Sequence, residues 1–145
     1  MQIVRHQEQH AELVGWAVSA MLLAAPGSES ADRIANRIAG FGGQVDRADE
    51  RYSAVSALIE DPAGYGFFVM ECDGLGGIEG GHEVMRLLRA AGLRLPVILI
   101  SRDCAAQVFP DDPLDAVQLR APLSAVSLRV GFEHALRERM FWRAA

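Results

Sequence analysis

The sequence predicts an α/β domain in which a parallel sheet has helices on both faces. Short apolar stretches alternate five times along the chain with stretches whose apolar residues recur at helical spacing. One of them, Pro96–Ser101, is apolar almost throughout, which is typical of a strand that is covered on both faces. This alternation favours a parallel sheet, because parallel strands need long crossover connections and these are usually helices.

The composition fits one packed domain. The chain has 145 residues and half of them are hydrophobic, which suffices for a single buried core. We expect an N-terminal extension over residues 1–17 and the folded domain over residues 18–145. The net charge of −5 argues against a nucleic-acid partner, because phosphate binding needs a basic surface. All 14 basic residues are arginine, so chemistry that needs a lysine ammonium is excluded.

Neither a membrane anchor nor a metal site is indicated. The uncharged stretch Leu13–Ala25 is too short for a membrane-spanning helix, and it follows acidic residues where a signal peptide has basic ones. We therefore expect a cytoplasmic protein without a membrane partner. Cys72 and Cys104 form no CxxC pair and are interpreted as buried thiols. His6 and His10 share a helical spacing, but no further ligand accompanies them, which favours a solvated face.

Glycine, proline and capping residues mark the ends of five expected strands and five expected helices. The expected strands cover residues 18–25, 44–48, 67–71, 96–101 and 116–119. The expected helices cover residues 31–39, 49–60, 82–91, 102–109 and 124–142. Ser28 or Ser30 can cap the first helix, since a serine oxygen accepts hydrogen bonds from free backbone N–H groups. Gly92 ends the third helix, whereas Pro110 and Pro113 keep the fourth one short.

The most suggestive stretch for chemistry lies around the third strand. The apolar residues Phe67–Met70 end in two acids, Glu71 and Asp73, and five glycines follow from Gly74 to Gly81. Carboxylates at the end of a buried strand are common at the ligand site of an open α/β sheet. The glycines lack the Lys-Ser/Thr end of a P-loop, so we interpret them as a mobile turn that permits positive φ. Nucleotide binding by this loop is the alternative.

The two acids also allow an enzymatic interpretation. Strand residues two apart face the same side, so Glu71 and Asp73 can reach one cleft as a general acid–base pair. No nucleophile with an adjacent base accompanies them, and we interpret His82 as a helix-start residue and His134 as solvated. A small α/β enzyme therefore remains an alternative only.

In the order of its motifs, the chain over residues 18–140 resembles the receiver domain of bacterial two-component response regulators. The third strand, its acids and the following Gly-His-Glu-Val-Met-Arg-Leu-Leu-Arg resemble the family's third strand and third helix. Pro96–Ser101 resembles its proline-led fourth strand, which ends in Ser or Thr. Leu119-Arg-Ala-Pro122 resembles its Leu-x-Lys-Pro. The resemblance implies a three-layer α/β/α, flavodoxin-like doubly wound fold with a five-stranded parallel sheet of order 2-1-3-4-5.

The chain departs from this family at the residues that carry its chemistry. In the family, two acids after the first strand hold Mg²⁺, and an aspartate at the end of the third strand accepts phosphate. A Ser or Thr and a lysine then read the phosphoryl group. The cation is needed because a carboxylate attacks a charged phosphoryl group poorly unless that charge is neutralised. Here Ala24 and Ala25 stand at the acid-pair position, and Ala121, beside Arg120, stands at the lysine position. Only Ser101 is kept, as the switch hydroxyl.

Two residues compete for the acceptor position. Alignment forward through the loop and the third helix favours Asp73, whereas alignment back along the strand favours Glu71. A glutamate at this position would resemble a fixed imitation of a phosphorylated aspartate. The carboxylate that lies beside Ser101 over the strand ends distinguishes the two.

The resemblance implies a single-domain pseudo-receiver, which is a signalling module without enzymatic activity, metal or other cofactor. Its protein partner, or a second copy in a homodimer, is expected on the face of the fourth helix, fifth strand and last helix. The alternative is an atypical phosphoacceptor that uses Mg²⁺ and either Asp73 or Glu71. If Asp73 is the acceptor, Glu71 and Glu29 take the place of the acid pair. Phe141 and Trp142, at the end of the last helix, are expected to cover the core or to contact a partner.

Overall fold

The structure, a computed structural model, describes residues 19–144, and side chains over residues 19–135. The strands are β1 (Ser19–Leu23), β2 (Gln44–Ala48), β3 (Phe67–Glu71), β4 (Val97–Ser101) and β5 (Val117–Arg120). The helices are α2 (Glu29–Gly40), α3 (Arg51–Glu60), α4 (Gly77–Ala90) and α5 (Ala125–Ala144). The expectations for residues 1–17 and for the side chains of Phe141 and Trp142 lie outside the described part of the chain.

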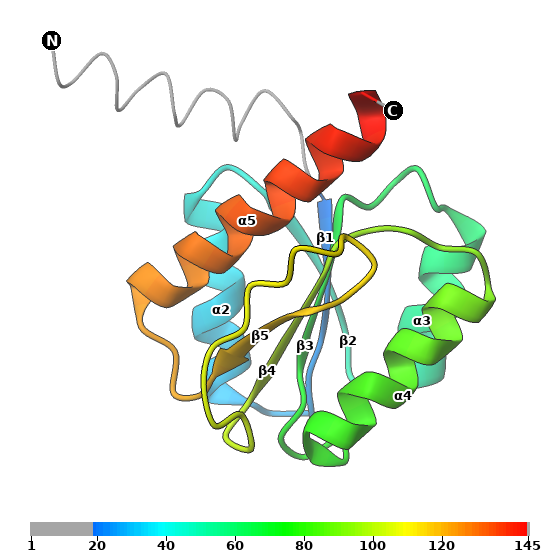
Figure 1. Ribbon diagram of the computed structural model, residues 1–145. Helices are drawn as coiled ribbons and strands as arrows, with labels where there is room; N and C mark the ends of the chain where they lie inside the picture. The colour runs from blue at the N-terminus through cyan, green and yellow to red at the C-terminus, as the bar shows by residue number, and fades with distance from the viewer. Residues whose placement is uncertain (1–18, 145) are drawn as a thin grey trace, which may run out of the picture.

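The five strands form one parallel sheet in the order β2-β1-β3-β4-β5, which confirms the predicted fold. Helices α2 and α5 cover one face of the sheet, and α3 and α4 cover the other (Figure 1). The central strands β3 and β4 are buried at every position. None of the described helices is both long and apolar enough to cross a membrane.

Alternating side chains of β3 build the two layers of the core. Phe67 faces α5, where its ring centroid lies 4.3 Å from that of Phe132, and Phe68 faces the layer of α3 and α4. Successive side chains of a strand point to opposite faces. Glu71, four residues after Phe67, therefore emerges on the α2–α5 side, at the carboxyl edge of the sheet.

The helix predicted over residues 102–109 is absent, so this prediction is wrong. The described residues between β4 and β5 form turns and extended chain. Val108 pairs with Gln118 of β5 in an antiparallel bridge of two backbone hydrogen bonds, at 2.8 and 2.9 Å. Pro110 and Pro113 leave too few residues for a helix to nucleate and extend. The face expected to contain a fourth helix is therefore made by this connection, by β5 and by α5.

Arg89 of α4 joins the α4–β4 loop to the β4–β5 connection. Its Nη1 donates to the carbonyl oxygens of Leu93 and Leu95 at 2.9 and 3.1 Å, and its Nε donates to that of Leu114 at 3.2 Å. Burial lowers the pKa of this guanidinium from its ordinary value. Even so, arginine keeps its charge in proteins, so these are charge-assisted hydrogen bonds.

Helix α4 begins at Gly77, earlier than the start predicted at His82. Gly76, with φ 97°, turns the chain into the helix, and the Asp103 carboxylate accepts a hydrogen bond from the Ile78 N–H at 3.3 Å. Gly81 lies inside the helix against the sheet, where a Cβ would come within 2.7 Å of the Cys72 Sγ. Part of the glycine cluster is thus a closely packed helix, and the interpretation as a mobile turn is wrong for that part.

Candidate functional site

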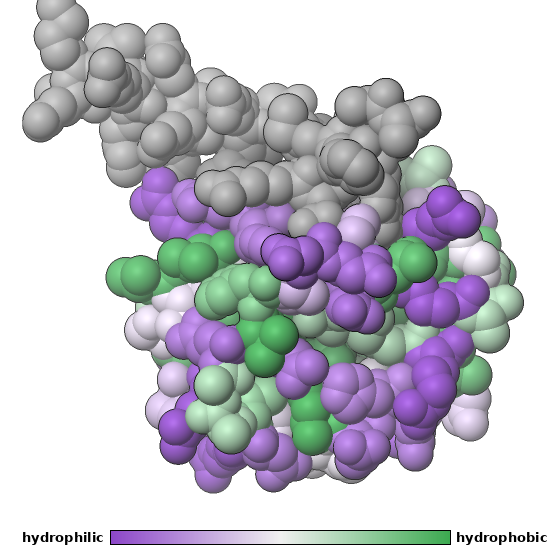
Figure 2. Space-filling view, in the orientation of Figure 1, coloured by the Kyte–Doolittle hydropathy of each residue, from purple (hydrophilic) through white to green (hydrophobic). Residues whose placement is uncertain are grey.

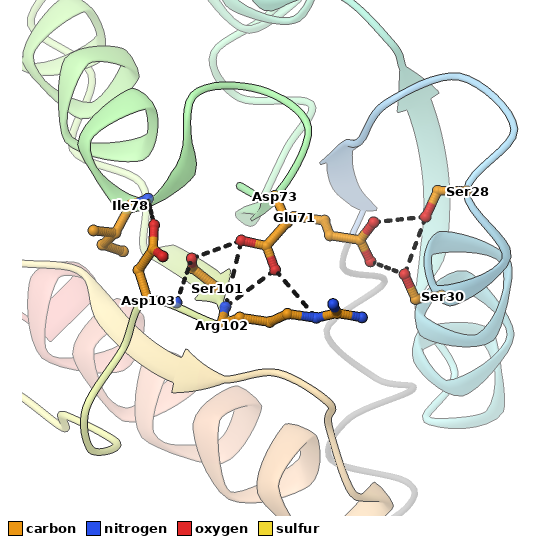
Figure 3. A network of polar contacts seen from close by, with 8 residues as sticks. All are labelled: Ser28, Ser30, Glu71, Asp73, Ile78, Ser101, Arg102 and Asp103. Carbon is orange, nitrogen blue, oxygen red and sulfur yellow. Dashed lines mark hydrogen bonds and ion pairs between the residues drawn. The ribbon is translucent and has the colours of Figure 1, made fainter.

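The candidate site lies at the carboxyl edge of the sheet, where the ends of β1, β3, β4 and β5 meet (Figure 3). Glu71 and Ser101 are 8% and 0% exposed and are the buried polar side chains of residues 19–135. Buried polar groups are costly unless they are hydrogen-bonded. Their partners therefore show how the site is organised.

Asp73 is the carboxylate that lies beside Ser101. The Ser101 Oγ donates to Asp73 Oδ1 at 2.8 Å, and the Arg102 N–H donates to Oδ2 at 3.1 Å. Ser101 Oγ also accepts from the Asp103 N–H at 3.0 Å, which fixes the hydroxyl in this orientation. The Arg102 Nε stands 4.0 Å from Oδ2, as a loose ion pair on an exposed side chain. The Asp73 carboxylate is therefore held by the end of β4, through the Ser101 hydroxyl and the Arg102 N–H.

Glu71 points away from Ser101 and contacts the start of α2 (Figure 3). One of its carboxylate oxygens accepts from the Ser28 hydroxyl at 2.6 Å, and the other accepts from the Ser30 hydroxyl. Ser28 is also the N-cap of α2, since its Oγ accepts from the Ala31 N–H at 3.1 Å. The strand-end glutamate thus ties β3 to α2, and the two acids do not act on one point.

Ala24, Ala25 and Ala121 are the residues that the resemblance aligns with the family's acid pair and lysine. Ala24 is buried, and its N–H donates to the Ala48 carbonyl at 3.1 Å. Ala25 lies against the loop after β3, because a Cβ on Gly74 would be 3.1 Å from its own. The Ala121 N–H donates to the Ser101 carbonyl at 3.1 Å. Ala25 adjoins the Asp73 loop and Ala121 lines one cavity with Asp73, and neither side chain supplies a charged group.

The described residues do not fit a magnesium ion. Mg²⁺ requires hard oxygen ligands in octahedral geometry, and proteins supply one or two free carboxylates for it. Here the Glu71 oxygens are taken by serine hydroxyls and the Asp73 oxygens by Ser101 and Arg102. No group of three or more His, Cys, Asp and Glu side chains in the described part of the chain is arranged to hold a metal.

A small cavity of about 170 Å³ opens beside the two acids. Its walls come from α2, from the ends of β3 and β4, and from the connection between β5 and α5. Three arginines line it, Arg33 and Arg37 from α2 and Arg102 from the loop after β4. Sequence reasoning missed this group. The available signal was the spacing of Ser30, Arg33 and Arg37, which places them on one face of α2.

The cysteines and His134 have structural surroundings. Cys72 and Cys104 are buried and free, as predicted, and burial raises the pKa of the Cys72 thiol to about 12. The interpretation of His134 as solvated is wrong. Its Nε2 lies 2.8 Å from the Pro110 carbonyl oxygen and its ring is edge-on to Phe109, so it links α5 to the β4–β5 connection.

No family model matches the sequence, and no curated protein matches it either. Solved structures are similar in fold. A response regulator receiver domain protein from Clostridium thermocellum is 13% identical with a TM-score of 0.66, over 86% of this chain and 98% of that one. A response regulator receiver protein from Sinorhizobium medicae is 18% identical with a TM-score of 0.62, over 85% and 97%.

A third similar structure is the receiver domain of the histidine kinase CKI1 from Arabidopsis thaliana, in complex with Mg²⁺ and BeF₃⁻. It is 15% identical with a TM-score of 0.58, over 87% of this chain and 95% of that one. The three structures match nearly all of their own length, so the likeness covers a whole domain. The chain therefore has the fold of receiver domains.

Proposed function

We propose that this protein is a pseudo-receiver, a signalling module that binds a protein partner and catalyses no phosphotransfer. The observation that supports this most directly is the pair of hydrogen bonds on Asp73. In the resembling family, a hydroxyl at the position of Ser101 reads the phosphoryl group. Here the Ser101 hydroxyl already donates a hydrogen bond to the Asp73 carboxylate. The Arg102 N–H donates a second hydrogen bond to the same carboxylate. In this proposal the unmodified carboxylate holds the site in one fixed arrangement.

The lack of a lysine and of acids at positions 24 and 25 supports the same proposal, since the three arginines beside Asp73 cannot hold Mg²⁺. Phosphoryl transfer to a carboxylate requires cations that neutralise the charge developing on the phosphoryl oxygens. The chain has alanine at positions 24, 25 and 121, and it has no lysine. In the proposal the protein acts without Mg²⁺ or another cofactor and is not an enzyme.

The test is phosphorylation with acetyl phosphate and Mg²⁺, followed by intact-mass measurement. We expect no gain of a phosphoryl group, under conditions in which a receiver domain with the full set of acids and lysine is modified. The variant Asp73→Asn identifies the site of any modification. Stable, Mg²⁺-dependent modification that this variant abolishes would establish the alternative, an atypical phosphoacceptor at Asp73.

The partner surface in this proposal is the face of the β4–β5 connection, β5 and α5. Several apolar side chains there are exposed, namely Val108, Phe109, Leu114, Val126 and Val130. Figure 2, in the orientation of Figure 1, shows hydrophobic residues interspersed with hydrophilic ones. This mixture is expected for the surface of a protein that folds without its partner and binds it reversibly. The partner is a protein or a second copy of the chain, and it is neither nucleic acid nor membrane.

Substitution of one exposed residue on each side of the sheet tests this surface. Val126 on α5 is 71% exposed and Tyr52 on α3 is 65% exposed, so Val126→Asp and Tyr52→Asp leave the core intact. We expect the first variant to lose captured partners, or a dimer seen by light scattering, and the second to keep them. The reverse result would move the surface to the α3–α4 side.

A further inference from the structure

The cavity beside Asp73 is small and lined by three arginines, and the pseudo-receiver proposal gives these arginines no role. Its volume of about 170 Å³ is close to that of cavities that hold a benzene-sized ligand. Pockets for nucleotide-sized ligands are several hundred Å³, so this cavity fits a small group only. Ile34, Ile100 and Leu128 form apolar parts of its wall.

Arg37 lines this cavity, and its guanidinium carries an unsatisfied donor. Its Nη1 is buried, and no acceptor within residues 19–135 lies at hydrogen-bonding distance. A guanidinium cannot be deprotonated in proteins, so a buried donor of this kind costs free energy until an acceptor reaches it. The side chain is therefore prepared for an acceptor that the described chain does not supply.

The neighbouring charges have the same sign. Arg33, one turn before Arg37 on α2, has no hydrogen bond or ion pair with another described residue. Arg102 reaches the cavity from the opposite wall. The two carboxylates at the rim, Glu71 and Asp73, already accept hydrogen bonds from hydroxyl and N–H groups. Positive charge thus exceeds negative charge around the cavity, and guanidinium donors remain free.

We infer that this cavity binds a phosphate-sized oxyanion, non-covalently, through Arg33, Arg37 and Arg102. Guanidinium groups bind phosphate through paired N–H donors, and a phosphate has enough oxygens and charge for several of them. The anion is free phosphate or the phosphoryl group of a small phosphomonoester. No bond to Asp73 forms. The bound anion joins α2 to the loop after β4, so it stabilises the fold and acts as a regulatory ligand.

Calorimetric titration with inorganic phosphate at constant ionic strength tests the inference. We expect saturable one-site binding and no change in intact mass. Arg37→Met and Arg33→Gln should each weaken binding about tenfold or more, as for loss of a charge-assisted hydrogen bond. Arg86→Gln is the matched control, because Arg86 is exposed on α4 at the other face of the sheet, and it should bind like the unaltered protein.

Folding of the variants is controlled within the same design. Without phosphate, Arg37→Met should be at least as thermostable as the unaltered protein, because it removes a buried donor without a partner. Arg33 is exposed, so Arg33→Gln tests the site even if Arg37→Met does not fold. Phosphate should raise the melting temperature of the unaltered protein and of Arg86→Gln, and not that of Arg37→Met.

Three outcomes would overturn the inference. The first is absence of saturable phosphate binding to the unaltered protein. The second is equal weakening by Arg37→Met and Arg86→Gln, which would show a diffuse effect of net charge. The third is acetate binding as tightly as phosphate, which would make the cavity a carboxylate site. Glycerol phosphate as a second titrant distinguishes a phosphomonoester from free phosphate. The result does not depend on whether Asp73 can be phosphorylated.

Discussion

At the scale of single residues, two acids only two positions apart have different roles. Glu71 is 8% exposed and accepts from two serine hydroxyls at the start of α2. The side chain of Asp73 is 34% exposed and accepts from Ser101 and Arg102 at the end of β4. Removing an acceptor from a buried group costs more than removing it from an exposed one, since water can replace the partner only at the surface.

Paired substitutions of these acids test that difference. In Glu71→Gln the side-chain NH₂ faces a serine hydroxyl in place of an acceptor oxygen, and we expect a loss of about 1–3 kcal/mol in the free energy of unfolding. Asp73→Asn should lose less than about 1 kcal/mol, as is usual for an exposed position. Urea unfolding measures both. A larger loss in Asp73→Asn would contradict the assignment of Glu71 as the structural acid.

A second pair of substitutions tests the packing of the glycine cluster. A Cβ at Gly81 would meet the Cys72 Sγ at 2.7 Å and Leu99 at 3.1 Å, so Gly81→Ala should destabilise the fold by about 1–3 kcal/mol. Gly40 ends α2 in open space, and Gly40→Ala should stabilise it by about 0.5–1 kcal/mol. Thermal unfolding of both variants should give shifts of opposite sign. Shifts of the same sign would contradict the close approach of α4 to β3.

At the scale of elements, local signals predicted the strands and crossovers, and tertiary contacts decided the rest. The early start of α4 was missed because glycine has low helix propensity, whereas close packing at Gly81 requires it. The helix over residues 102–109 was predicted from a short stretch that ends at two prolines, Pro110 and Pro113. Its true conformation depends on the Val108–Gln118 bridge and on Arg89, which join residues distant in the sequence. Helical periodicity alone cannot reveal such contacts.

The hydrogen bonds of Arg89 give the test at this scale. Arg89→Ala frees three carbonyl oxygens and should lower the free energy of unfolding by about 2 kcal/mol. Arg86→Ala removes the same charge from an exposed position of α4 and should change stability by less than about 0.5 kcal/mol. Hydrogen exchange should also accelerate in residues 102–116 of the first variant only. Equal behaviour of the two variants would contradict the role of Arg89 as the anchor of the connection.

The cap of α3 makes part of the stability dependent on pH. The Glu50 carboxylate accepts from the Tyr52 and Ser53 N–H groups at 2.8 and 2.9 Å, and these hydrogen bonds lower its pKa below the ordinary value of 4.5. A carboxyl whose pKa is lowered by folding stabilises above its unfolded pKa, and the contribution is lost as the pH falls through the folded pKa. The melting temperature should fall below about pH 4.5, and less steeply in Glu50→Gln. Identical profiles would contradict this contribution of Glu50.

At the scale of the whole molecule, the resemblance to receiver domains implied the sheet order, and the sequence left Glu71 and Asp73 as alternatives for the carboxylate beside Ser101. Asp73 and Ser101 could be brought together because the ends of neighbouring parallel strands lie at one edge. The serine partners of Glu71 and the arginine cavity could not be predicted. Both depend on the directions in which side chains leave α2, and the cavity also depends on how the β5–α5 connection approaches α2. A periodic pattern in the sequence shows neither of these features.

At this scale, the pseudo-receiver proposal predicts one conformation that does not depend on phosphorylation. Beryllofluoride with Mg²⁺ mimics a phosphorylated carboxylate when a receiver can bind both. Because the oxygens of Asp73 are already bonded and alanine stands at 24 and 25, we expect no change in the amide NMR spectrum beyond that caused by salt. The variant Ala25→Asp/Ala121→Lys restores part of the missing charge and should respond more strongly. Shifts in the unaltered protein that centre on Asp73, Ser101 and the β4–β5 connection would instead reveal a working switch.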